Sequence, residues 1–147
     1  MIQKNVSFFA GGSALWSEPV PVEHNVSLFV QESKFTAILS IDGEDIALMC
    51  FMTGYDKIRD DGVVIDAKGH AAFVDSDGEM LRLTFRSCWG DDDYRIEFRL
   101  ASGTGKWTGA TGTIKGTLTL LSGIEDDKKF GAVEAEGAIN MAEQSIS

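Results

Sequence analysis

The chain has 147 residues, of which 44% are hydrophobic and 24% charged, and it carries 23 acidic residues against 13 basic ones. This length suits one domain with its own core, and the composition lies outside the range of disordered chains. The net charge of −10 repels phosphate backbones and anionic lipid, so neither nucleic acid nor a membrane is an expected partner. Sixteen glycines against two prolines are typical of many short strands joined by tight turns.

The chain has no run of apolar residues near the roughly 18 that a membrane helix needs. Residues 6–16 are mildly apolar but contain Gly11, Gly12 and Ser13, and they lack a small-x-small cleavage pattern. We therefore predict a cytoplasmic protein. The two cysteines, Cys50 and Cys88, lie in apolar, strand-like runs. Buried reduced thiols are the simplest interpretation, and a disulfide or a nucleophile is the alternative.

Hydrophobic residues alternate with period two along most of the chain, and no repeat or linker divides it. The alternation predicts strands at residues 22–30 and 35–41, and Asp42-Gly43 then supplies a hairpin turn. Residues 46–53 are apolar on both faces, which indicates a strand buried on both sides. We expect a loop at residues 54–62, and two short strands at 63–66 and 70–74 that flank a turn at Lys68-Gly69.

In the second half, a turn is expected at residues 75–78, and strands at residues 81–86, 94–100, 111–121 and 130–139. Residues 1–20 would form an N-terminal arm or first strand, and residues 141–147 a frayed tail. Eight or nine strands without crossover helices predict an all-β fold. We expect residues 1–147 to form a single antiparallel, eight-stranded, calycin-like β-barrel, because closure removes exposed sheet edges; a β-sandwich is the alternative.

The most distinctive stretch is the glycine-rich segment at residues 103–112. It is not a Walker A loop, because the spacing before Lys106 is wrong and no helix is expected after it. It is not a Rossmann fingerprint either, since strands flank it on both sides. Paired glycines instead permit a bulge and a sharp reversal, and we expect Trp107 to cover one end of the barrel.

This segment resembles the allene oxide cyclase-like and dirigent-like barrel superfamily through Gly103, Gly105, Trp107, Gly109, Ala110 and Gly112. The turn at residues 73–78 and the strand end at residues 88–90 are also similar to bacterial members. The resemblance implies an eight-stranded barrel that holds a small apolar ligand without a cofactor, often as a dimer or trimer. Its members include cyclases and dirigent proteins that steer radical coupling, so the fold alone does not fix the chemistry.

One further similarity lies near residue 24. Allene oxide cyclases carry a Glu-x-Asn sequence in their first strand region, and this chain has Glu23-His24-Asn25. The tyrosine-bearing strand that follows in those enzymes is not recognisable, so their full site does not transfer.

Four of the five arginines fall on two consecutive predicted strands, each pair on a single face: Arg82, Arg86, Arg95 and Arg99. If that face is exterior, they form a cross-strand charge ladder. If it is interior, they form a cationic lumen that also contains Cys88. The exterior placement is favoured, because burying several guanidinium groups without partners is costly.

Two histidines and one tyrosine are further candidates. His24 shares its predicted face with four aliphatic residues and is either a satisfied core or lumen histidine or a general base. His70 is similar, and Tyr55 lies in the longest predicted loop. The histidines lack zinc-site spacing, and Asp75-x-Asp77-Gly78 lacks the other ligands of a calcium loop, so no metal site is expected.

The leading hypothesis is a small-molecule enzyme that binds a hydrophobic, anionic or carbonyl-bearing substrate in the barrel and catalyses a cofactor-free cyclisation, isomerisation or elimination. The alternatives are a non-catalytic carrier and a structural, oligomer-forming barrel with a filled lumen. The expected partners are a small hydrophobic molecule and further copies of the chain, as a dimer or trimer. The candidate catalytic residues are His24, Glu23 and Tyr55, and the candidate substrate-binding residues are Asn25, Arg82, Arg86, Cys88, Met49, Phe51 and His70.

Overall fold

The computed structural model describes residues 1–89, 94–121 and 128–142, and most of them are in β-strands. The strands are β1 (Ile2–Trp16), β2 (Val20–Glu23), β3 (Val26–Ile41), β4 (Glu44–Arg59), β5 (Val64–Asp75), β6 (Met80–Trp89), β7 (Tyr94–Gly103), β8 (Thr111–Leu121) and β9 (Lys128–Met141). Between β7 and β8 lies η1 (Gly105–Trp107), a single turn of 3-10 helix. Within these described ranges, no helix has the length and apolar character needed to cross a membrane.

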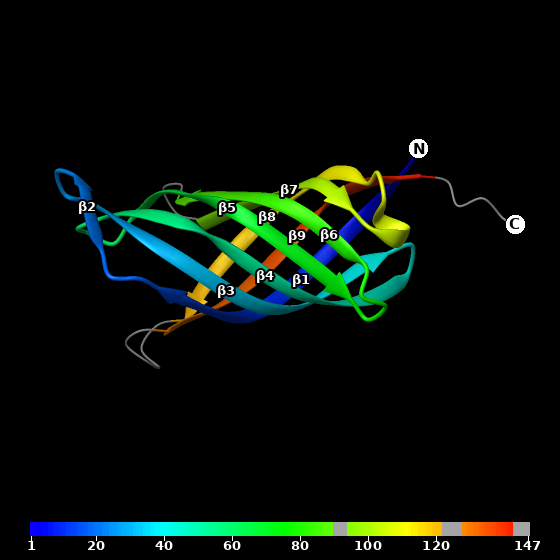
Figure 1. The fold of residues 1–147 in the computed structure, drawn as a ribbon, viewed down its shortest axis with the longest axis horizontal. Helices are drawn as coiled ribbons and strands as arrows, with labels where there is room; N and C mark the ends of the chain where they lie inside the picture. Colours follow the sequence, from blue (N-terminus) through cyan, green and yellow to red (C-terminus); the bar gives the residue numbers. More distant parts are fainter. Residues whose placement is uncertain (90–93, 122–127, 143–147) are drawn as a thin grey trace, which may run out of the picture.

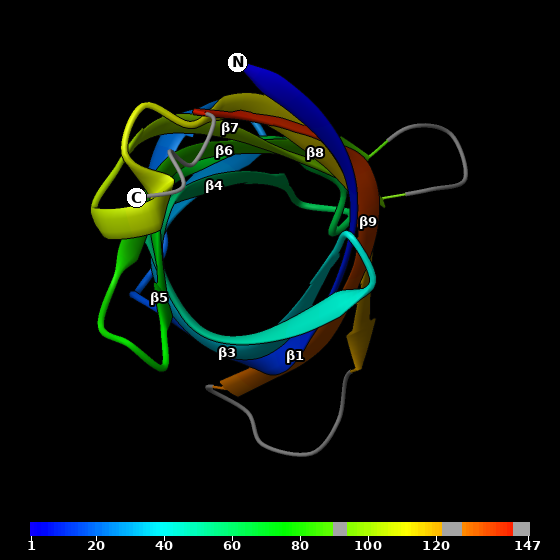
Figure 2. The same cartoon turned by 90° about the vertical axis from the view of Figure 1, so that its right-hand side faces the viewer.

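The strands close into an eight-stranded antiparallel barrel, as predicted (Figures 1 and 2). Neighbours follow one another from β9 back to β3, and β1 closes the ring by pairing with both β9 and β3. β2 is an additional short strand that pairs only with β3, beyond the point where β1 ends. Figure 1 shows β2 at one end of the barrel, and the N-terminus and the end of β9 at the other.

The barrel interior is built by side chains that alternate along every strand. Phe35, Ala37 and Leu39 of β3 point inward and are buried, while the residues between them are exposed. The centre of this core is an aromatic cluster of Phe8, Phe73 and Phe98. The rings of Phe8 and Phe73 stack with centroids 5.2 Å apart, and Phe98 meets them edge-on at 5.7 and 5.4 Å. Burial of this apolar surface is the main force that closes the sheet.

Several strands are longer than predicted. β1 is a full barrel strand, and β4 continues through Gly54 and Asp56 into the predicted loop at residues 54–62. The turn expected at Lys68-Gly69 does not exist, because these residues lie inside β5. Met141, expected in a frayed tail, ends β9 and is buried; residues 143–147 lie outside the described part of the chain.

The two glycines behind these errors allow close packing rather than turns. Gly54 and Gly69 lie opposite each other on β4 and β5. A Cβ atom on Gly54 would overlap the carbonyl oxygen of Lys68, and one on Gly69 would overlap that of Thr53. The glycines therefore let the backbones of β4 and β5 approach more closely than side chains would permit.

We expect Gly69→Ala to lower the free energy of unfolding by about 1–3 kcal/mol, because the methyl group forces the two backbones apart. Urea denaturation measures the change. Gly11→Ala is the matched control, since a Cβ there meets only one backbone oxygen at 3.8 Å. The control should be neutral or slightly stabilising, and an equal loss in both variants would contradict the close-packing explanation.

Candidate functional site

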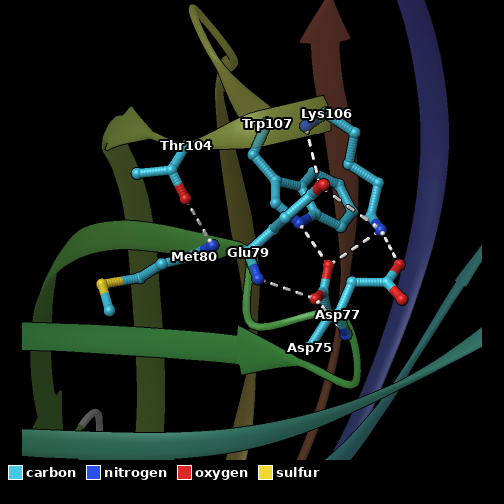
Figure 3. Close-up of polar contacts among 7 residues, drawn as sticks. All are labelled: Asp75, Asp77, Glu79, Met80, Thr104, Lys106 and Trp107. Atoms are coloured by element: carbon cyan, nitrogen blue, oxygen red, sulfur yellow. Dashed lines mark hydrogen bonds and ion pairs between the residues drawn. The ribbon is translucent and has the colours of Figure 1, made fainter.

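The turn between β5 and β6 and the segment that contains η1 lie together at one end of the barrel (Figure 1). We call it the latch end, and it comprises residues 75–79 and 104–110. Trp107 is 1% exposed and belongs to the core cluster, so its side chain is buried at this end of the barrel. Figure 3 shows the polar contacts that hold it there.

Asp75 is the centre of these contacts, with a side chain that is 1% exposed. Its Oδ2 accepts a hydrogen bond from Trp107 Nε1 at 3.0 Å and lies 2.9 Å from Lys106 Nζ. Its Oδ1 accepts hydrogen bonds from the backbone amides of Asp77 and Glu79 at 2.9 and 3.0 Å. Glu79 Oε2 accepts a hydrogen bond from the Lys106 amide at 2.8 Å. The Asp75 carboxylate thus connects the β5–β6 turn to η1 (Figure 3).

The pKa values of this cluster follow from its contacts. Burial alone raises the pKa of the Asp75 carboxyl, but the hydrogen bonds from Lys106, Trp107 and the turn amides outweigh it and lower the pKa below its ordinary value. The hydrogen bonds from Lys106 to Asp75 and Asp77 raise the pKa of the lysine. Asp75 and Lys106 are therefore a stable ion pair at neutral pH, and their role is structural.

The opposite end of the lumen, toward β2, contains a small hollow. Its accessible volume is about 50 Å³, which is enough for a few water molecules. Most of its wall is apolar, and four polar side chains from β3, β4 and β6 interrupt that wall. The polar residues are Gln31, Ser33, Asp56 and Ser87, and the others include Trp16, Phe35, Met52, Val64, Phe85, Ile96 and Leu118.

Asp56 is the one acidic residue of this hollow in the described ranges, and it is only 3% exposed. Gln31 Nε2 donates a hydrogen bond to Asp56 Oδ1 at 2.9 Å. Ser33 Oγ in turn donates to Gln31 Oε1 at 2.7 Å, which fixes the orientation of the Gln31 amide. The amide therefore occupies one oxygen of the Asp56 carboxyl and leaves the other available to a ligand.

Burial raises the pKa of Asp56 to about 6, although the hydrogen bond from Gln31 acts in the opposite direction. Desolvation disfavours the carboxylate, and the wall of the hollow contains no basic side chain among the described residues. A carboxyl with a pKa near the working pH can both donate and accept a proton. Asp56, Gln31 and Ser33 thus form a candidate site for binding and proton transfer.

The structure places the candidate residues around His24 at an exposed turn and not on the buried face of a strand. The expected strand at residues 22–30 is wrong, because β2 ends at Glu23 and β3 begins at Val26. His24 and Asn25 form the turn between them, and Asn25 has a positive φ of 62°. Glu23, His24 and Asn25 are all exposed, so the predicted buried face of His24 does not exist.

Most other candidates lie on the outer face of the barrel. Tyr55 points away from its neighbour Asp56, and its ring lies 5.7 Å from Lys68 Nζ. The expectation that β4 is buried on both faces is wrong, because Met49 and Phe51 are exposed. His70, on β5, is exposed as well. The alternation of the strands explains this placement, since the odd positions of β4 face outward.

The arginines are exterior, as favoured. Arg82, Arg86, Arg95 and Arg99 are all exposed. Arg86 lies opposite Glu97, which lies opposite Lys115, which lies opposite Glu136, so opposite charges alternate across four strands. Each such pair contributes modestly, about 0.2–1 kcal/mol.

The structure tests the prediction of buried, reduced thiols for one of the two cysteines. Cys50 is a free, buried thiol, and burial raises its pKa to about 12, so it is a poor nucleophile. The side chain of Cys88 lies outside the described part of the structure. No group of three His, Cys, Asp or Glu side chains in the described ranges is arranged to hold a metal ion.

The sequence interpretation missed the polar residues of the hollow. Gln31 and Ser33 continue the inward face of Phe35 along β3, and Asp56 continues that of Cys50 and Met52 along β4. Extending the period-two pattern through Gly54 would have placed Asp56 inside the barrel. The interruption at Gly54 was interpreted as a loop, and so the signal was lost.

Comparison with known proteins supports the fold. No protein-family model and no curated protein matches the chain. The solved structures that are similar to it include two of pterocarpan synthase dirigent proteins. GePTS1 has 15% sequence identity and a TM-score of 0.55, over 100% of this chain and 90% of that one. PsPTS1 has 13% identity and a TM-score of 0.56, over 97% of both chains. The chain thus has the barrel fold of the dirigent proteins.

Proposed function

We propose that the barrel binds a small apolar molecule in the hollow beside Asp56 and directs its cyclisation, isomerisation or elimination without a cofactor. The observation that carries this proposal is a buried carboxyl group, oriented by Gln31, in the wall of an otherwise apolar hollow. The dirigent fold of the chain and its resemblance to allene oxide cyclases agree with a barrel that holds and directs a substrate.

The charges of the hollow define the substrate class. With an acidic residue and no basic one among its described lining residues, the hollow disfavours an anionic substrate. A neutral ring compound with a carbonyl or similar acceptor fits better, because protonated Asp56 donates a hydrogen bond to that oxygen. Any ring compound, including the two probes used below, requires the walls to move apart, since the accessible space is about 50 Å³.

Asp56 would move the proton in this reaction. Its protonated form donates a proton to a substrate oxygen that gains negative charge, and its carboxylate accepts a proton from a substrate carbon. The apolar walls exclude water and restrict the conformations of the substrate, which favours one product over others. Gln31 is a positioning residue that keeps the carboxyl in one orientation.

The elimination of 5-nitrobenzisoxazole tests the proposal. In this neutral bicyclic probe, a base removes the ring C–H proton, the N–O bond breaks, and a coloured phenolate forms. We expect the protein to accelerate the reaction above the buffer rate, with a rate that rises through pH 6 as Asp56 ionises. Asp56→Asn should lose about a hundredfold of that rate, the lower end of a general-base contribution.

The matched control is Asp60→Asn, which removes an exposed carboxylate from the turn after β4 and should leave the rate unchanged. Equal rates in wild type and Asp56→Asn would contradict the proposed role of Asp56. Saturation-transfer NMR with acetophenone, a neutral aryl ketone, separates an enzyme from a carrier. A protein that binds acetophenone but leaves 5-nitrobenzisoxazole intact would be the carrier.

A further inference from the structure

The outer surface of the barrel has two unlike halves. Over β6–β9, the described outward side chains are mostly charged or small and polar, as in the row of Arg86, Glu97, Lys115 and Glu136. None of the described residues after Ile65 is a large, exposed hydrophobic residue. All such residues lie in the first half of the chain, and most of them are on β1–β5. The β6–β9 half of the surface therefore suits solvent, and the β1–β5 half does not.

Four of these side chains form what we call the apolar strip: Phe9, Ile38, Met49 and Phe51. They are 60%, 43%, 43% and 41% exposed, respectively. Phe9 of β1 lies opposite Ile38 of β3, and Met49 and Phe51 follow on β4. Phe9, Ile38 and Met49 line one surface hollow of about 540 Å³, so the strip is continuous. A contiguous apolar patch of this kind marks an interaction surface in soluble proteins.

The acidic end of the strip lies beside Phe9 and Ile38. Glu134 of β9 is directly opposite Phe9. Two residues along β9, Glu136 lies opposite Ser7 of β1. Ser7 lies opposite Ser40 of β3, which in turn lies opposite Asp45 of β4. The one base among the described residues close by is Lys115, which lies on the far side of Glu136. The carboxylates of Asp45, Glu134 and Glu136 are all exposed.

The basic end of the strip lies beside Phe51. Lys34 is opposite Phe51, with its Nζ 5.9 Å from the ring. On the other side, Phe51 is opposite Ala72, which is opposite Arg82. A second hollow, of about 950 Å³, includes Lys34, Phe51 and Arg82 in its lining, together with one acid, Glu32. The strip therefore runs from an acidic end to a basic end.

We propose that the apolar strip binds a second copy of this chain, with the acidic end of one strip against the basic end of the other. A surface with an apolar centre and opposite charges at its two ends is complementary to itself when one copy is reversed. Such a contact covers the exposed aromatic and aliphatic side chains and pairs Arg82 and Lys34 with Glu134 and Asp45. This inference is independent of what the lumen binds.

Sedimentation velocity at micromolar concentrations tests the proposal. The wild-type protein should sediment as an oligomer of the 15.9 kDa chain, and Met49→Glu should sediment as a monomer. Thr119→Glu, at an exposed position of β8, is the matched control and should remain oligomeric. A monomeric wild type, or an oligomer that survives both Met49→Glu and Ile38→Glu, would overturn the proposal.

Charge exchange tests the orientation of the two copies. Arg82→Glu should weaken self-association at least about tenfold, and adding Glu134→Arg to the same chain should restore it, because the two charges then meet in reverse. Failure of the double variant to recover would contradict the end-to-end arrangement. Circular dichroism verifies that each variant is folded, and the Asp56-dependent elimination reaction is measured separately, so that the two proposals fail independently.

Discussion

Replacing Asp75 by alanine is expected to lower the free energy of unfolding by about 3–5 kcal/mol, the usual cost of removing one partner from a buried ion pair. The variant leaves the indole N–H of Trp107 and two backbone amides of the turn without their acceptor. Each buried donor without a partner costs about 1–3 kcal/mol. Urea denaturation at pH 7, followed by tryptophan fluorescence, measures the loss.

Asp77→Ala is the matched control for this experiment. Asp77 contacts the same Lys106, at 3.1 Å, but its side chain is 69% exposed. Its removal should cost less than about 1 kcal/mol, as for other surface ion pairs. Equal, small losses in the two variants would mean that the latch end does not depend on Asp75.

The contribution of Asp75 also has a defined pH dependence. Its folded-state pKa is lowered, so the unfolded chain binds the proton more tightly. The stabilisation is therefore fully present above the unfolded pKa, about 3.9, and is lost as the pH falls through the folded-state value. The difference between wild type and Asp75→Ala should be constant from pH 6 to 8 and should shrink only in acid.

Asp56→Asn is expected to stabilise the protein at pH 8 by about 3 kcal/mol and to have little effect at pH 4. The folded-state pKa is raised from 3.8 to about 6, and each pKa unit corresponds to about 1.4 kcal/mol. Because the folded state holds the proton more tightly, stability is highest below pH 3.8 and is lost as the pH rises through 6. Asparagine removes the charge and keeps an acceptor for Gln31. Thermal or urea unfolding across pH 4–8 measures the effect.

Asp60→Asn again serves as the control, because that carboxylate is exposed and its loss should change stability little. A stabilised Asp56→Asn variant that has lost the elimination activity would indicate that the fold tolerates a destabilising acid for the sake of function. If Asp56→Asn destabilises the protein equally at pH 4 and pH 8, the carboxyl is a structural group and the proposed site is wrong.

The sequence predicted the barrel because its strongest signal, period-two alternation, is also what closes the sheet. The exterior placement of the arginines was predicted on a different basis, the cost of burying charge. The positions at which the strands end were harder to predict from the sequence. Gly54 and Gly69 are typical turn residues, and only the three-dimensional contact between β4 and β5 shows that they permit close packing.

The candidate site was predicted less well, for a related reason. His24 was assigned to a strand by alternation, but Asn25 adopts a left-handed conformation that reverses the chain beside it. Asp56 was assigned to a loop, although it lies in β4, two residues beyond Gly54. Its partner Gln31 is 25 residues away, so the hydrogen bond that orients the carboxyl depends on the register between β3 and β4. That register is a property of the folded barrel.

The central claim is that Asp56 is a buried acid whose protonation changes near neutral pH. A carbon-13 NMR titration of the aspartate side-chain carboxyl groups tests it directly, with the Asp56 signal assigned by its absence in Asp56→Asn. We predict a midpoint near pH 6. A midpoint near pH 4, the ordinary value of a solvated aspartate, would contradict the claim.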